Sequence, residues 1–145
     1  MSHSLHDERG GNAQREADLA PSIADFERIA HAAFESMPRA FTSGCDNLIV
    51  RVADFAGHEV LAHMNIEDPF ELTGIYSGVD LRQKSVTDAL QMPDEVWLYR
   101  RPILEEWIER GDVGLAALIA HVLVHEIGHH FGLSDEDMEA VVADL

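Results

Sequence analysis

Two histidines and a glutamate near the C-terminal end have the spacing of a metal site that also carries a base. His125 and His129 are four residues apart, and Glu126 directly follows the first of them. On a helix, residues four apart share one face and lie about 6 Å apart along the axis, so both imidazoles can bind one zinc ion. Glu126 is rotated by about 100° from His125 and can reach a water on that zinc without entering its coordination shell. The stretch therefore predicts a zinc site with a carboxylate beside it.

A third protein ligand has to come from beyond this helix, because catalytic zinc sites usually have three. Gly132 can adopt the left-handed conformation that ends the helix and turns the chain back toward the metal. Asp135 follows it and is the predicted third ligand, although the same residue would also favour the dipole at the start of a last helix. Glu139 is the rival ligand, and Glu136 is a weaker one.

This set of residues suits the hydrolysis of a peptide bond. Zinc lowers the pKa of its bound water to about 7 and polarises a carbonyl, but a base must still take the proton during attack. Glu126 is the predicted base, and the same carboxyl group later gives the proton to the leaving amine. Tyr76 is a candidate hydrogen-bond donor to the developing oxyanion, with simple packing as the alternative. The pattern predicts a zinc metallopeptidase, a hydrolase whose substrate is a peptide or protein.

Other histidines are not expected to bind the same ion. His121 lies on the stripe of the pair but is about 12 Å from His129 along a helix axis, too far for zinc bonds of about 2 Å. His130 points away from the pair. His58 and His63 also flank a glutamate, but their spacing of five leaves the rings about 140° apart around a helix. They are not predicted to form a second site.

Composition limits the class of partner. The chain has 145 residues and fits one compact domain. Ten basic and 27 acidic residues give a formal net charge of −17, which repels phosphate groups. Nucleic acid and anionic membranes are therefore not expected as partners. The longest apolar stretch, residues 113–124, is shorter than the ~20 residues of a membrane-spanning helix and predicts a buried helix instead.

The single cysteine and the first residues bear on the compartment. Cys45 has no partner for an intramolecular disulfide, which favours a reducing cytoplasm. The first twenty residues lack the basic start and apolar stretch of a secretory signal. Residues 1–21 are polar and without periodicity, so we expect a disordered N-terminal tail there and the folded domain over residues 22–145.

Periodicity and turn residues predict the elements of this domain. Ser22 with Asp25 resembles a helix start, and Ser134 with Asp137 resembles another. The charged ends of the strand at 95–100 suggest the edge of a sheet, and Asp112 is the expected cap of the buried helix. The expected elements are helices over 22–38, 102–110, 113–131 and 134–142, strands over 47–53 and 95–100, and mostly loop over 54–84 with a short helix near 57–64.

The run HEIGHHFGLSD, residues 125–135, resembles the HExxHxxGxxD motif of aspartate-type zincins. Residues 70–79 and 97–104 also resemble the small bacterial zincin-like metallopeptidases called mini-zincins, so the resemblance covers most of residues 22–145. It implies a minimal zincin-like α+β fold, with a small mixed sheet packed on a backing helix and an active-site helix. It further implies an edge strand over the cleft that pairs with an extended peptide, and we expect residues 95–100 to be that strand.

The resemblance carries over residue by residue. It implies that His125, His129 and Asp135 are the metal ligands and that Glu126 is the base. The first alternative is a non-catalytic zinc-binding or interaction protein on the same scaffold. A second is a zinc-dependent ribonuclease, because bacterial rRNA-maturation endoribonucleases have a similar helix. The acidic net charge and Glu126, which peptide hydrolysis needs, oppose this second alternative.

Overall fold

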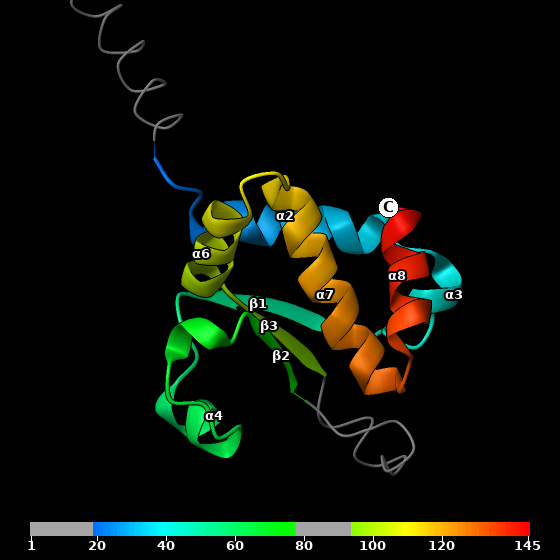
Figure 1. The fold of residues 1–145 in the computed structure, drawn as a ribbon. Coiled ribbons are helices and arrows are strands. Elements are labelled where there is room, and N and C mark those ends of the chain that lie inside the picture. Colours follow the sequence, from blue (N-terminus) through cyan, green and yellow to red (C-terminus); the bar gives the residue numbers. More distant parts are fainter. Residues whose placement is uncertain (1–18, 78–93) are drawn as a thin grey trace, which may run out of the picture.

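The computed structural model describes residues 19–77 and 94–145. These residues form an α+β fold in which a small sheet is covered by helices (Figure 1). This confirms the expected fold class. The elements are α2 (Ile23–Ser36), α3 (Arg39–Thr42), β1 (Ile49–Ala53), α4 (His58–His63), a 3-10 turn (Pro69–Glu71), β2 (Gly74–Ser77), β3 (Glu95–Tyr99), α6 (Arg100–Arg110), α7 (Leu115–Phe131) and α8 (Asp135–Ala143).

The sheet is mixed, and its strand order corrects one prediction. β3 pairs with β1 in parallel and with β2 in antiparallel orientation, so β3 is the central strand and β2 lies at an edge. Residues 95–100 were expected at the edge because their ends are charged. Those end charges are instead paired with neighbouring elements: Glu95 contacts Arg51 at 3.3 Å, and Arg100 contacts Asp54 at 3.0 Å. Between them, Val96 and Leu98 are fully buried.

The edge strand β2 falls in a segment that was expected to be mostly loop. That prediction was wrong for Gly74–Ser77, because a strand of four residues beginning with glycine has too little sequence pattern to be recognised. Its backbone pairs with β3 over the whole length, from Gly74 opposite Leu98 to Ser77 opposite Glu95. The short helix expected near residues 57–64 is confirmed as α4. The expectations for residues 1–18 and 78–84 lie outside the described residues.

The larger part of the core lies between the sheet and the helices α2, α6 and α7. α2 begins with the expected capping box, in which Ser22 Oγ accepts from Asp25 N at 3.1 Å and Asp25 accepts from Ser22 N at 2.8 Å. Phe26 and Ala30 of α2 are fully buried against α7. Burial of this apolar face, more than helix propensity, stabilises α2.

α7 runs through the middle of the domain, as expected of an almost wholly apolar helix. Eight of its residues are buried, including Ile119, Leu123 and Ile127. The helix begins after Gly114 and not after Asp112, so the expected aspartate cap was wrong. Gly111 ends α6 and Gly132 ends α7, both in the left-handed conformation with φ of 71° and 72°. Ser134 caps α8 by accepting from Asp137 N, also as expected.

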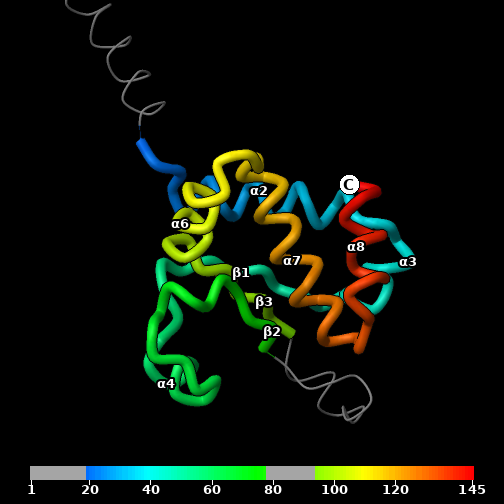
Figure 2. The backbone as a smooth tube through the Cα atoms, in the orientation of Figure 1, coloured from blue at the N-terminus to red at the C-terminus, as the bar shows by residue number. Residues whose placement is uncertain are grey.

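A second, smaller hydrophobic cluster supports α4. Leu61 is the one buried residue of α4, and it packs with Ala56, Leu72 and Tyr99. In the backbone trace of Figure 2, α4 lies apart from α2, α6 and α7, with the sheet between them. The two faces of β3 therefore contact different layers, and the side chains of β3 that point away from α7 face the space beside α4.

Candidate metal centre

The histidine pair and the glutamate lie in the last two turns of α7, where the helix leaves the core. His125 and Glu126 are half-buried, and His129 is exposed. The residues between and before them, Ile127 and Val124, are fully buried and hold the helix in place. The two imidazole rings have centroids 5.9 Å apart, as expected for residues one turn apart on one face.

Asp135 joins this pair at a distance that a metal ion can bridge. One ligand atom from each of His125, His129 and Asp135 can be chosen so that all three lie within 4.8 Å of one another. A tetrahedral zinc ion with bonds of about 2 Å separates its ligand atoms by about 3.3 Å, so small side-chain rotations would complete the geometry. No other such group of His, Cys, Asp and Glu is found within residues 19–77 and 94–145.

His125 is suited to metal binding in its protonation state and its surroundings. Its Nε2 is buried and has no hydrogen-bond partner among the described residues. A buried polar atom without a partner costs free energy, and a bound cation would remove that cost. Burial lowers the pKa of His125, and the neighbouring His121 and His129 lower it further. The imidazole is thus held in the neutral form that binds metal.

The turn at Gly132 brings Asp135 to the site. The N–H of Gly132 donates to the carbonyl of His129 at 3.1 Å, and the N–H of Leu133 donates to that of Gly128 at 2.9 Å. These bonds close the end of α7 and reverse the chain into α8, whose first residue is Asp135. The rival Glu139 lies one turn further into α8 and is not in the group of three.

Close packing between α7 and α8 sets the position of that turn. A Cβ on Gly128 would overlap the side chain of Met138, which is fully buried. Glycine at this position, between the two histidines, therefore lets α8 lie directly against α7. Gly128 occupies an unspecified position of the motif, and its packing role is not revealed by its place in the sequence alone.

Glu126 is half-buried beside the edge strand. Burial raises the pKa of its carboxyl group to about 7, and a hydrogen bond from the backbone N–H of Tyr76 opposes this rise. β2 approaches α7 closely here, because a Cβ on Gly74 would lie 3.0 Å from Val122 Cγ1 and 3.5 Å from Glu126 Cγ. Gly74 thus allows the approach that places the Tyr76 N–H at the carboxylate.

Tyr76, a candidate site residue from the sequence, has contacts in the structure that the sequence did not reveal. Its ring stacks on His130, with centroids 3.9 Å apart and planes inclined by 8°. Its hydroxyl donates to Asp94, which is only 6% exposed. Burial raises the pKa of Tyr76, and the negative charge of Asp94 raises it further. The hydroxyl that was a candidate donor to an oxyanion is bound to Asp94 in this structure, and this contact anchors β2.

The remaining histidines take the places that their spacing predicted. The ring of His121 lies 4.3 Å from that of His125 but is not part of the group of three. His130 stacks on Tyr76 and is not part of the group of three. His58 and His63, on α4, belong to no metal-ligand group among the described residues.

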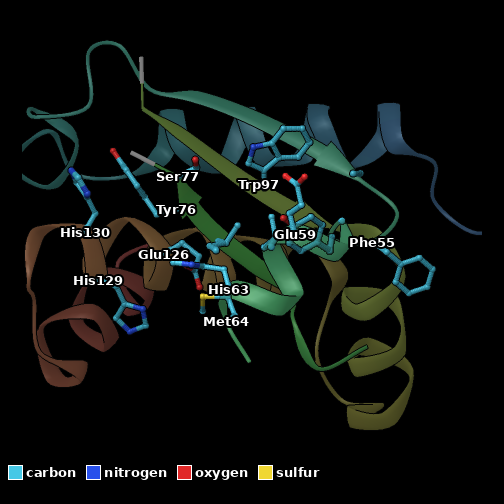
Figure 3. Close-up of a pocket in the computed structure, with 15 residues that line it drawn as sticks. Phe55, Glu59, His63, Met64, Tyr76, Ser77, Trp97, Glu126, His129 and His130 are labelled. Carbon is cyan, nitrogen blue, oxygen red and sulfur yellow. The ribbon is translucent and has the colours of Figure 1, made fainter. Parts of the chain in front are cut away.

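A cleft of about 810 Å³ opens at Glu126 and extends along the sheet to α4. Figure 3 shows Tyr76 and His130 at one end of this cleft and Trp97 and Glu59 toward the other. The lining residues come from β1, β2, β3, α4 and the residue after it, α7, and the loop after β1. They are Ala53, Phe55, Gly57, Glu59, Val60, His63, Met64, Ile75, Tyr76, Ser77, Trp97, Tyr99, Glu126, His129 and His130.

Comparison with known families agrees with this geometry. A family model described as zincin-like metallopeptidase matches residues 45–144. The chain therefore belongs to the zincin-like metallopeptidase family, as its motifs suggested. Individually curated proteins give no match to the chain. In the described part of the chain, no helix has the length and apolar character needed to cross a membrane.

Proposed function

We propose that this protein is a zinc-dependent peptidase. His125, His129 and Asp135 hold the zinc ion, and Glu126 is the general base. The observation that carries the proposal is the meeting of the three ligand atoms, which come from two helices and lie within 4.8 Å of one another. Glu126 lines the cleft next to them. The match to zincin-like metallopeptidases over residues 45–144 supports the same reaction class.

Glu126 carries the proton through the reaction. When zinc is bound, it polarises the peptide carbonyl and makes water acidic enough to lose a proton near neutral pH. Glu126 takes that proton while the water oxygen bonds to the carbonyl carbon. As the C–N bond breaks, Glu126 gives the proton to the leaving amine. The products are a new carboxyl terminus and a new amino terminus. The Tyr76 N–H keeps the carboxyl group oriented during both transfers.

The peptide backbone has a place to bind at the edge of the sheet. β2, unlike β3, lies at an edge of the sheet, and it lies directly beside α7 and Glu126. An extended peptide can add to such an edge through main-chain hydrogen bonds. We therefore assign to residues 74–77 the pairing role that the sequence suggested for residues 95–100.

The compartment and the absence of nucleic-acid partners stay predictions from composition. Cys45 is buried and free, and burial raises the pKa of its thiol to about 11, which keeps it unreactive. A buried thiol of this kind fits a reducing cytoplasm. The net charge of −17 disfavours both nucleic acid and anionic membranes as partners.

Metal analysis of the purified protein followed by a peptide-library cleavage assay tests the proposal. The wild type should hold one zinc ion per chain and cleave a subset of peptides. Glu126→Gln should keep the zinc and lose about 10²- to 10⁴-fold in kcat. Glu35→Gln, on the exposed face of α2, removes the same charge and should leave both properties unchanged. Equal cleavage by wild type and Glu126→Gln would overturn the peptidase assignment, while zinc binding without cleavage would favour a non-catalytic zinc protein.

A further inference from the structure

The cleft extends well past the proposed metal centre, and its far part has a different character. There it is bounded by α4 and by the face of the sheet that points away from α7. Trp97 lies on this face in the middle strand, between Arg51 of β1 and Ile75 of β2. Glu59 and Val60 of α4 line the opposite wall. A peptide side chain that enters here meets an aromatic ring, an aliphatic wall and a carboxylate.

The ring of Trp97 is held in a fixed orientation. Its Nε1 donates to Glu95 Oε2 at 2.9 Å, and the Arg51 guanidinium carbon lies 5.9 Å from the ring centroid. Arg51 is itself paired with Glu95, whose Oε1 lies 3.3 Å from the Arg51 Nε. The pairing offsets the positive charge near the ring, so Arg51 opposes a second cation only weakly. Arg51 does not line the cleft.

The charges that line the cleft favour a cation. Its ionisable side chains include Glu59, Glu126 and three histidines, and no lysine or arginine among residues 19–77 and 94–145 lines it. Glu126 belongs to the proposed catalytic group, whereas Glu59 lies on α4, a separate element. Figure 3 places the Glu59 carboxylate toward the same end of the cleft as the Trp97 indole. An aromatic face together with a carboxylate is a general arrangement for binding an ammonium or guanidinium group.

We infer that the α4 end of the cleft binds a lysine or arginine side chain of the peptide substrate. The inference rests on the proposed peptidase function and adds its substrate class. Val60 and Met64 contact the alkyl stem of the substrate side chain, while Trp97 and Glu59 receive its charged head. Glu59 and Trp97 are therefore specificity-determining residues. The protein's net charge of −17 also attracts cationic peptides to this surface.

Two measurements separate this inference from the function on which it rests. The first uses zinc-loaded Glu126→Gln protein and fluorescently labelled octapeptides that carry lysine, norleucine or glutamate at each position in turn. Binding is followed by fluorescence anisotropy. The second follows cleavage of the same peptides by the protein with Glu126 intact. Each is repeated with Glu59→Gln and with Glu35→Gln, an exposed glutamate of α2 that does not line the cleft.

The expected result is tighter binding of the lysine peptide than of the norleucine peptide at one position, by about 5- to 20-fold. Glu59→Gln should reduce this preference about 3- to 5-fold, because a single partly exposed charge pair is removed. Trp97→Leu should reduce it by a similar factor, and Glu35→Gln should leave it intact. Glu59 is exposed, so its substitution is not expected to affect folding.

Each outcome of these two measurements either supports or contradicts the inference. Equal binding of lysine and norleucine peptides, no peptide binding at all, or a preference that survives Glu59→Gln would overturn the inference. Cleavage without a basic preference would overturn it and leave the peptidase assignment standing. A lysine preference in binding, without cleavage by the protein with Glu126 intact, would support the side-chain site and count against the peptidase assignment alone.

Discussion

Two helices of this molecule contain a His-Glu pair followed by a second histidine. Among the described residues, only the pair in α7 has a third possible metal ligand beside it. In α7 the histidines are His125 and His129, and in α4 they are His58 and His63. A residue in the left-handed region follows each helix, Gly132 with φ of 72° after α7 and Asn65 with φ of 57° after α4. Side chains from both stretches line the same cleft.

The two helices differ in the spacing of their histidines and in the buried structure that supports them. A spacing of four puts two imidazoles on one helix face, whereas a spacing of five separates them around the helix. α7 is a helix of 17 residues, eight of them buried, while α4 has six residues and one buried residue, Leu61. α7 also has α8 packed against it, which supplies Asp135. A metal site needs ligands held by buried structure, and the motif letters alone do not provide that support.

The largest difference is expected in zinc binding after replacement of the second histidine of each stretch. His129→Ala should weaken zinc binding more than about 100-fold, because it removes one of three protein ligands and not merely a supporting group. His63→Ala should leave one zinc ion bound per chain. Competition with a fluorescent chelator measures both affinities. If both variants held zinc as the wild type does, the assignment of α7 as the metal helix would be wrong.

The two glutamates should differ in their effect on stability. In the metal-free fold the pKa of Glu126 is raised to about 7 from an ordinary value of 4.5. The protonated carboxyl group of Glu126 makes its full contribution to the free energy of unfolding below pH 4.5. This contribution is lost as the pH rises through 7, which lowers the free energy of unfolding by about 3 kcal/mol. Glu126→Gln should therefore stabilise the metal-free protein by about 2–3 kcal/mol at pH 8 and by almost nothing at pH 4.5.

Urea unfolding of chelator-treated protein at the two pH values measures this difference. Glu59→Gln is the matched control, because Glu59 is exposed and should give no such pH-dependent gain. A stability gain that is the same at pH 8 and pH 4.5 would show that burial of the Glu126 charge is not its cause.

The next difference between the two stretches is the carboxylate that α8 supplies beside α7. Asp135→Ala should weaken zinc binding by about 10- to 100-fold, since two histidines remain. Glu139→Gln, one turn further along α8, should leave the affinity within about twofold. The reverse order in the chelator competition would make Glu139 the third ligand.

The smallest difference between the two helices is expected at the residue directly before the second histidine, which is Gly128 in α7 and Ala62 in α4. Gly128→Ala places a methyl group where the buried Met138 lies and should cost about 1–2 kcal/mol, with α8 displaced from α7. The matching change in α4, Ala62→Gly, affects an exposed position and should cost at most about 1 kcal/mol through helix propensity. Thermal unfolding measures both. Weaker zinc binding in Gly128→Ala, but not in Ala62→Gly, would further link the packing of α8 to the metal site.

Much of the metal centre could be predicted from sequence because its geometry is local. The spacing of His125 and His129 determines their common face on any helix, and Gly132 determines where that helix stops. The capping residues Ser22 and Ser134 likewise act on amides within three residues. Such interactions connect near neighbours in the chain, so their residue pattern is sufficient.

The strand order and the surroundings of Glu126 depend on contacts between segments that are distant in the sequence. Whether β3 lies in the centre of the sheet depends on β1 and β2 both pairing with it, and the charged ends of β3 do not reveal this. The hydrogen bond from Tyr76 to Glu126 joins a short strand to a helix fifty residues later in the chain. Sequence determined which groups could bind zinc and move a proton. Only tertiary packing, which buries Glu126 and aligns β2 beside it, decided how that chemistry is enclosed.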